Sequence, residues 1–330
     1  MGYLKAALAF MFAAGLVMYP KECASAALTA MNTWATSVAP ALFPFAAVMP
    51  FITCDEARNI YERIFGRITQ RLFRLPGGTA SAIVIGFLSG SPAGALAVAR
   101  VAEAERLTKG ETARLAGIVC GVSPVYMISV LGTAMNGSAA VGWRLAGAQM
   151  MAQIAAGVLL RKMNFGSEMA ERLYNKNEGD RPVASATNAV LRVCGHMALF
   201  SVGINMVSMV FGDNVLRFAA FADLPSGVQY CKNTAVLAAA AGFGGACICV
   251  QNLSVLKGMV KVWVYITHKV ITSILCAAFF MMMGNVRIRG FRTSEGLKSM
   301  LFEKNLLLAA AIILIVLLFY AVKQTKKHFS

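Results

Sequence analysis

Residues 80–101 read ASAIVIGFLSGSPAGALAVARV, an apolar run that is interrupted in its middle by the polar and flexible segment 89–94. Glycine and proline in tandem stop a helix. The apolar pieces on either side are too short to cross a bilayer, which takes about 20 residues. Irregular backbone at membrane depth is tolerated only where it is buried in protein or lines a cavity. The stretch therefore predicts a re-entrant helical hairpin over 79–101.

The composition of the whole chain is that of a membrane protein. Of its 330 residues, 58% are hydrophobic and only 14% are charged, whereas about a quarter of the residues of a soluble domain are charged. We therefore expect an all-α, multi-pass integral membrane protein. The first apolar segment is expected to be an uncleaved helix, with a cleaved signal peptide as the alternative. The apolar segments are 3–19, 34–53, 115–135, 141–160, 189–211, 259–283 and 306–322.

The charge distribution indicates which solutes suit this chain. The net charge of +16 is interleaved with the apolar segments, which is typical of loops near anionic lipid and argues against nucleic acid. The acidic residues lie outside the long apolar runs, and none lies in 224–294. Such a core is better suited to an anion than to cations or to proton relay. No zinc-type cysteine spacing or catalytic motif is present, so we expect no metal, no cofactor and no enzyme activity.

The order of apolar, basic and interrupted segments divides the chain into five parts. Residues 1–33 are expected to form a first transmembrane helix and a short loop. Residues 34–160 form a first unit with an amphipathic helix over 55–75 and the hairpin over 79–101. A cytoplasmic linker over 161–188 leads to a second unit over 189–284, with a hairpin over 233–253. Residues 285–330 form a basic loop, a last transmembrane helix and a basic tail.

The helix predicted over 55–75 has two stripes with a spacing of four residues. One stripe is apolar and includes Ile60, Ile64 and Ile68, and the other carries Arg63 and Arg67. This pattern favours a helix that lies in the headgroup layer. A solvated loop helix is the alternative.

Three short motifs recur in the same order in the two units. ALFPF at 41–45 is matched by ALFSV at 198–202, and LPGG at 75–78 by LPSG at 224–227. GFLSG at 86–90 is matched by GFGG at 242–245. If neither interrupted segment crosses the membrane, the two units run in opposite directions, which is an inverted repeat. The Arg-rich inserts 55–75, 100–114 and 161–181 then share the cytoplasmic side, and the loop 212–223 lies opposite.

The breaks in these segments supply the candidate binding residues. A helix that begins at a break presents N–H groups and a positive dipole end, which suit a carboxylate. Lys269, deep inside its span, is the natural counter-ion for a dianion. Its alternative role is a snorkelling side chain, and the glycines are alternatively helix-packing residues. The candidates are Ser89, Gly90, Ser91, Gly94, Ser123, Gly244, Gly245, Gln251, Asn252 and Lys269.

Several of these motifs together resemble a known family. ALFPF at 41–45, LFRLPG at 72–77, GFLSGSPAGA at 86–95, Ser123-Pro124 and the later Gly-Gly…Gln251 block are similar to the YlbJ-type sporulation integral membrane proteins. That family carries the Gate, or nucleoside-recognition, domain. The resemblance covers most of residues 30–285. Ser91 departs from it, because an aromatic residue is expected there, and so does the cysteine-rich stretch after Gly245.

This resemblance implies a fold related to concentrative nucleoside transporters, with inverted repeats and two re-entrant hairpins. It also implies a place in the cell membrane or forespore membrane of a spore-forming bacterium, and movement of dipicolinate into the developing spore. We expect a transporter or conduit for a small organic anion. A nucleoside transporter is one alternative, disfavoured by the absence of acids at both tips, and a sporulation membrane scaffold is the other. Expected partners are the anion, membrane lipids, and further copies or other sporulation membrane proteins.

Overall fold

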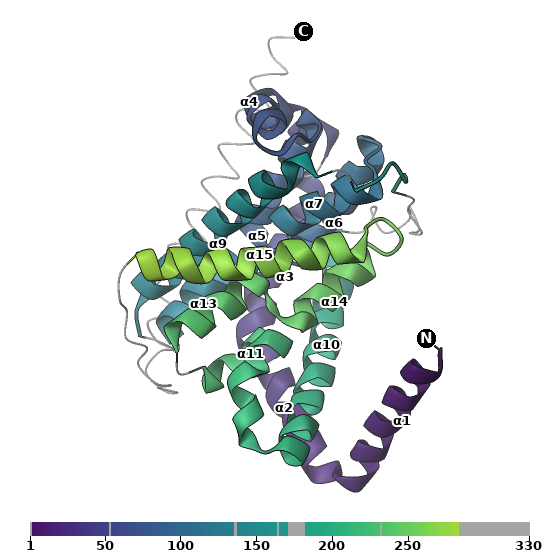
Figure 1. Ribbon diagram of the computed structural model, residues 1–330, viewed down its shortest axis with the longest axis vertical. Helices are drawn as coiled ribbons and strands as arrows, with labels where there is room; N and C mark the ends of the chain where they lie inside the picture. The colour runs from purple at the N-terminus through teal and green to yellow at the C-terminus, as the bar shows by residue number, and fades with distance from the viewer. Residues whose placement is uncertain are drawn as a thin grey trace.

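The computed structural model describes residues 2–52, 54–134, 137–163, 165–170, 182–231 and 233–283, and these residues contain helices and turns but no strand. The predicted last transmembrane helix and tail, 285–330, lie outside the described residues. The α-helices are α1 Gly2–Met18, α2 Pro20–Thr33, α3 Ala39–Ile52, α4 Asp55–Phe73, α5 Ala80–Ser89, α6 Ala93–Ala104, α7 Lys109–Val119, α8 Pro124–Tyr126, α9 Ala139–Leu159, α10 Pro182–Phe211, α11 Ala219–Ala222, α12 Leu224–Gly227, α13 Thr234–Phe243, α14 Gly245–Val255 and α15 Val262–Met282 (Figure 1).

Four helical segments in the described part of the chain are long and apolar enough to cross a membrane, and a bent pair gives a fifth if it is counted as one span. The four are Lys109–Thr133, Ala186–Phe211, Thr234–Val255 and Val262–Met282. The prediction of an all-α, multi-pass integral membrane protein is therefore confirmed. Helix α9 occupies the segment predicted as a span over 141–160, but it is not among the four, because Arg144 and two glutamines lower its hydropathy.

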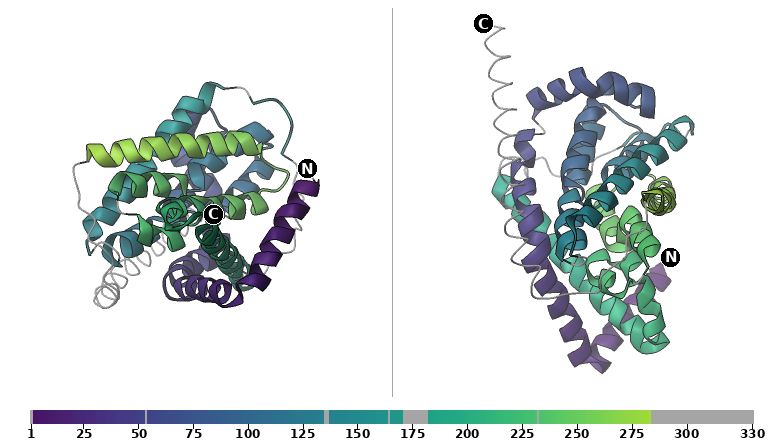
Figure 2. Two further views of the ribbon diagram at one scale, coloured as in Figure 1. Left: turned by 60° about the horizontal axis from the view of Figure 1, so that its bottom comes forward. Right: turned by 90° about the vertical axis from the view of Figure 1, so that its left-hand side faces the viewer.

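A long helix near the N-terminus replaces the short loop that was expected before residue 34. Pro20 starts α2 at its first turn, where a proline is preorganised for a helix. The chain continues through a π-helical turn, Trp34–Val38, into α3, so that α2 and α3 form one extended element along a side of the molecule (Figure 2). The prediction of a loop here was wrong, because small residues such as those of 24–30 favour a helix once it has begun.

This extended element packs against α10 in the opposite direction. Ser201 Oγ donates a hydrogen bond to the carbonyl of Ala26 at 3.0 Å, and Trp34 Nε1 donates to the carbonyl of Val190 at 3.0 Å. Residue numbers rise along one helix while they fall along the other. The predicted segments 34–53 and 189–211 therefore run in opposite senses, as an inverted repeat requires.

The first interrupted segment forms a helical hairpin. Helices α5 and α6 are joined by three residues, and Gly90 in that connection has φ +66°. The two helices meet on Val119: a Cβ atom at Gly86 would lie 2.4 Å from its side chain, and one at Gly94 would lie 2.9 Å away. With ten residues, α5 is about 15 Å long, which is half the apolar thickness of a bilayer.

The second interrupted segment is not a hairpin, and the prediction of one over 233–253 was wrong. Helices α13 and α14 continue as one candidate span of 22 residues, Thr234–Val255. They are separated only by Gly244, which has φ +88° and is followed by Gly245 with φ +82°. One residue is too short a connection to reverse the chain, whereas α5 and α6 have three. The two units therefore differ at this point, and the inverted repeat stays a prediction.

The described parts of the three Arg-rich inserts gather at one end of the molecule, as the topology predicted. Arg114 donates hydrogen bonds to the carbonyls of Phe73 and Arg161, at 3.3 and 3.0 Å. Arg161 in turn donates to the carbonyl of Arg71 at 3.3 Å. The loop 212–223 follows α10 at the opposite end (Figure 1).

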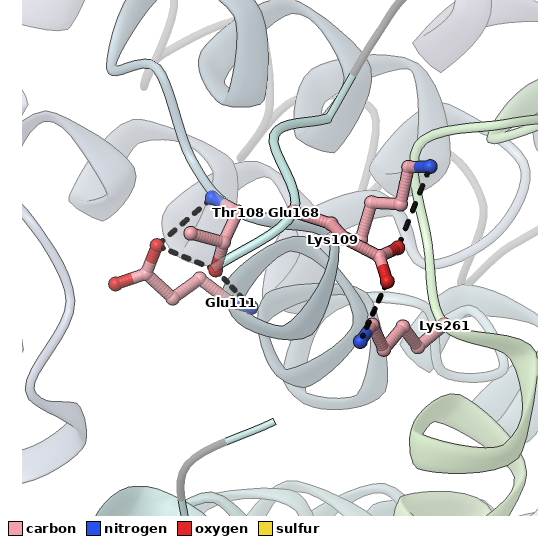
Figure 3. Close-up of polar contacts among 5 residues, drawn as sticks. All are labelled: Thr108, Lys109, Glu111, Glu168 and Lys261. Atoms are coloured by element: carbon pink, nitrogen blue, oxygen red, sulfur yellow. Dashed lines mark hydrogen bonds and ion pairs between the residues drawn. The ribbon is translucent and has the colours of Figure 1, made fainter. Parts of the chain in front are cut away.

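At the same end, the start of the expected linker is fixed across both units (Figure 3). Glu168 lies 3.7 Å from Lys109 and 3.4 Å from Lys261. Because Glu168 is largely exposed, each of these ion pairs contributes at most about 1 kcal/mol. Backbone bonds are the firmer link: the Lys109 N–H donates to the Glu168 carbonyl at 2.7 Å, and the Lys261 N–H donates to the Lys109 carbonyl at 3.3 Å.

Helix α4 exposes the apolar stripe that the sequence indicated. Ile64 is 59% exposed and Ile68 is 53% exposed, whereas Tyr61, Thr69 and Phe73 of the same helix are buried. An apolar stripe that the described residues leave uncovered is available to lipid. This arrangement fits the predicted place of α4 in the headgroup layer, which stays a prediction.

The seat of the hairpin on Val119 is testable with a pair of glycine substitutions. We expect Gly86→Ala to lower the thermal unfolding midpoint of the purified protein in detergent by several degrees, since the added methyl overlaps Val119 and overpacking costs about 1–3 kcal/mol. Gly195→Ala in α10 is the control, because no atom lies within 4 Å of its Cβ position. It should leave the midpoint unchanged or raise it. Equal losses in both variants would contradict the close seat.

Candidate functional site

Three breaks in helices meet at one place. A Cβ atom at Gly90 would lie 2.6 Å from the backbone nitrogen of Ser123, and the Ser91 N–H donates to the Gly121 carbonyl at 2.9 Å. From the second unit, Asn252 Nδ2 donates to Ser91 Oγ at 3.0 Å. The first hairpin tip, the predicted break near Ser123 and helix α14 are therefore in direct contact.

Two side chains that the sequence did not single out, those of Tyr265 and Gln149, hold these breaks in place. The Tyr265 hydroxyl accepts a hydrogen bond from Asn252 Nδ2 at 3.0 Å. Gln149 donates to the Val122 carbonyl at 2.9 Å and accepts from the Val122 N–H at 3.3 Å. The broken backbone between α7 and α8 is thus bonded by a buried side-chain amide in place of a helical turn. A glutamine inside an apolar helix is the signal that could have identified this role.

A small pocket, partly open to solvent, lies beside the junction. Its apolar wall includes side chains from α3, α10 and α14. Three residues of the lining each carry a buried polar atom that has no hydrogen-bond partner among the described residues: Ser123 Oγ, Tyr126 Oη and Asp223 Oδ1. An unpartnered buried polar atom costs about 1–3 kcal/mol, so this wall is suited to a polar solute or water. The polar residues of the lining are Ser91, Ser123, Tyr126, Asp223 and Gln251.

Asp223 corrects the inference that the core and the tips contain no acid. The sequence placed it in a loop on the far side, but its exposed fraction is 0%. Asp223 caps α12 and accepts a hydrogen bond from the Ser226 N–H at 3.1 Å. Close packing buries this turn: a Cβ atom at Gly227 would lie 2.1 Å from the nitrogen of Ala220. Burial raises the pKa of the Asp223 carboxyl, and hydrogen bonds from Ser226 and from the Cys247 thiol oppose that shift.

A local signal for Asp223 was present in the sequence. An aspartate followed by a proline at the second helical position and by a serine three residues on is an N-cap pattern. It stands directly before the LPSG motif at 224–227 that repeats the first unit. The motif was recognised, but the cap that fixes it was counted as part of an exposed loop.

Lys269 is buried and does not snorkel. Its exposed fraction is 0%, and its Nζ donates a hydrogen bond to the carbonyl of Cys120 at the C-terminal end of α7. Nζ also lies 5.8 Å from the centre of the Tyr265 ring and 4.0 Å from the Cβ position of Gly244. A cation at a helix C-terminus neutralises the negative end of the dipole. Lys269 is absent from the lining of the pocket, but its Nζ and the lining residue Val122 both lie within 4.0 Å of the Cβ position of Gly244.

The remaining candidates serve the backbone at the breaks. Ser89 Oγ donates to the carbonyl of Ile85 at 2.8 Å and so stays within its own helix. Gly94 packs on Val119, and Gly245 packs on the turn that carries Asp223, with its Cβ position 3.2 Å from the nitrogen of Leu224. Of the predicted residues, the structure thus places Ser91, Ser123 and Gln251 on the pocket and Asn252 behind Ser91. Gly90 and Gly244 have positive φ at the two breaks.

The pocket faces the helix ends that carry partial positive charge. Ser91 precedes α6, Ser123 is the N-cap of α8, and Gln251 lies in the second turn of α14. None of these three N-termini has a side-chain cap. Helices α5, α7 and α13, which end at the breaks, contribute no residue to the lining. Residues at or within two turns of these N-termini therefore line the pocket, while Lys269 compensates the negative end of α7.

Comparisons with known proteins agree with the motifs. No family model matches the chain, and no solved structure matches it. The chain is 23% identical over 230 residues to the "Sporulation integral membrane protein YlbJ" of Bacillus subtilis (strain 168). The match covers 62% of this chain and 56% of that relative, so the chain spans little more than half the length of the curated protein it matches. The predicted resemblance is confirmed: this multi-pass integral membrane protein is similar to a YlbJ-type sporulation protein.

Proposed function

We propose that the protein moves a small organic anion, dipicolinate in the first place, across a membrane of a spore-forming bacterium during sporulation. The observation that carries the proposal is the pocket between the broken helices, where Ser123, Tyr126 and Asp223 present buried polar atoms without partners among the described residues. A solute that occupies this pocket would supply those partners. The likeness to a sporulation membrane protein supports the biological setting.

The charges around the pocket favour an anion. Each helix N-terminus is equivalent to about half a positive charge, and three uncapped N-termini, those of α6, α8 and α14, lie around the pocket. The Lys269 ammonium adds a positive charge and is paired with a carbonyl in place of a carboxylate. Against these stand the carboxyl group of Asp223 and the negative C-terminal ends of α5, α7 and α13 at the same breaks, of which Lys269 compensates that of α7. The uncapped N-termini and the buried ammonium, and not a net sum of charges, are the features that favour an anion.

A nucleoside is the second candidate, and Asp223 is the observation that favours it. The argument against a nucleoside was the absence of acids at the tips, and that absence does not hold. A carboxylate oxygen without a partner, next to the hydroxyls of Ser123 and Tyr126, could accept hydrogen bonds from ribose hydroxyls. The two candidates differ in what Asp223 contributes: a carboxylate helps a nucleoside and repels an anion.

Ligand-induced stabilisation of the purified protein tests the proposal. A ligand that binds only the folded state raises its stability by about 2.7 kcal/mol at a concentration of one hundred times its Kd. We expect dipicolinate to raise the thermal unfolding midpoint in detergent, and picolinate, with one carboxylate, to raise it less. Uridine should leave it unchanged. Stabilisation by uridine alone would favour the nucleoside, and stabilisation by neither would favour the scaffold that transports nothing.

A further inference from the structure

A second cavity adjoins the pocket on the surface of α10. It is a partly open groove between α10, the first hairpin and α14, and α10 and α14 are neighbours in the fold (Figure 1). Its lining includes Pro92, Leu96, Arg192, His196, Gln251 and Ser254. The groove is not part of the site described above, and its basic side chains have no part in that site.

Only a thin wall separates the groove from the pocket. Val193 and Gln251 line both cavities. At the hairpin tip, Pro92 faces the groove while its neighbour Ser91 faces the pocket. On α10, Arg192 lines the groove, and Met197, little more than one turn further along, lines the pocket. The wall is therefore about one residue thick on each of the three elements that form it.

The side chain of Gln251, a shared residue of this wall, is held by a weak hydrogen bond. Its side-chain nitrogen donates to the sulfur of Cys247 at 3.2 Å, and a thiol sulfur is a weak acceptor. Rotation of this amide costs little compared with breaking a bond to a carbonyl or carboxylate. A change of its rotamer would join the two cavities without moving a helix.

The groove is basic where it meets the surface. Arg192 and His196 are four residues apart and share one face of α10, and His196 Nδ1 lies 2.7 Å from the Arg192 carbonyl. Arg192 is exposed and lines the groove together with Asn188. A cleft lined by one sign of charge raises the local concentration of the opposite ion and increases its association rate 10- to 1,000-fold.

We propose that this groove is the anion-selecting vestibule of the pocket, with Arg192 as the specificity-determining residue and Gln251 as the movable side chain between the two cavities. The proposal rests on the proposed function, because it assumes that an organic anion reaches the pocket. The ligand it selects is a small dicarboxylate, because a guanidinium binds a carboxylate through two parallel N–H donors.

The experiment compares Arg192→Gln and Arg192→Lys with Arg144→Gln, a control at an exposed arginine of α9 outside both cavities. Initial rates of labelled dipicolinate uptake are measured against concentration in vesicles of phosphatidylcholine, at low and high salt. We expect Arg192→Gln to raise KM about tenfold with Vmax nearly unchanged, and to weaken the salt dependence. Arg192→Lys should restore most of the loss, and Arg144→Gln should behave as the unmodified protein.

Each other result would overturn the vestibule in a recognisable way. Equal dipicolinate uptake by the unmodified protein and by Arg192→Gln would contradict the role of the groove as a vestibule and leave the proposed function intact. An effect of Arg192→Gln that appears only when phosphatidylglycerol is added would make the groove a lipid headgroup site. A protein that neither binds nor carries dipicolinate in its unmodified form would overturn the proposed function and the vestibule together.

Discussion

Lys269→Met abolishes dipicolinate flux if the account is correct, and this is one of the two largest effects that we expect. The substitution keeps the length of the side chain but removes the charge that compensates the C-terminal end of α7. The positive field at the pocket is reduced, and the Cys120 carbonyl loses its partner at a cost of about 1–3 kcal/mol. Flux per folded protein should fall at least about tenfold, which corresponds to about 1.4 kcal/mol.

The matched control is Lys257→Met, the same substitution at an exposed lysine between α14 and α15. It should leave both flux and stability unchanged. Size-exclusion chromatography in detergent establishes how much of each variant is folded, so that lost protein is not counted as lost activity. The Lys269→Met variant could instead yield less folded protein while each folded molecule carries dipicolinate normally. Lys269 would then be a structural residue, and the electrostatic argument for an anion would lose its strongest support.

Asp223→Asn has the second large expected effect, and its sign separates the two candidate solutes. The asparagine amide oxygen can still accept the Ser226 N–H that caps α12, so the turn should remain intact. For an anion, loss of the nearby carboxylate removes a repulsion, and dipicolinate flux should rise several-fold. For a nucleoside, the carboxylate would be a partner for ribose hydroxyls, and a site built to bond such groups loses much of its discrimination without it.

Asp213→Asn is the control. Asp213 is exposed in the same loop, and its substitution removes the same charge as Asp223→Asn. A rise in dipicolinate flux in both variants would reflect net charge alone. A rise only in Asp223→Asn would assign the effect to the pocket. Loss of dipicolinate flux in Asp223→Asn, with the protein folded, would mean that a carboxyl group takes part in binding, and the assignment of an anion would have to be withdrawn.

Local sequence signals predicted much of the fold. The interruption at 89–94 gave the first hairpin, because glycine and proline end helices wherever they stand in a chain. Clusters of arginine predicted that the three basic inserts share one end of the molecule, because basic loops are biased to one side of a membrane. The break at Gly244 was recognised, but its shape was not, because a glycine with positive φ can end one helix and start the next without reversing the chain. Only the packed structure distinguishes these outcomes.

The site was predicted in part for the same reason. Ser91, Ser123, Gln251 and Asn252 stand at or near breaks, and the structure brings them together. Asp223 was missed because its burial depends on contacts between α11 and α12 and with α14, none of which has a local signature. Burial of a charged residue is decided by tertiary packing, and its position before a helix indicates only a cap.

The most direct test of the central claim is uptake of labelled dipicolinate into proteoliposomes that contain the purified protein, with unlabelled uridine as competitor. The account predicts saturable dipicolinate uptake that uridine does not reduce, that Lys269→Met abolishes and that Lys257→Met leaves intact. Uptake of labelled uridine in the same vesicles, with none of dipicolinate, would contradict it and assign the pocket to a nucleoside.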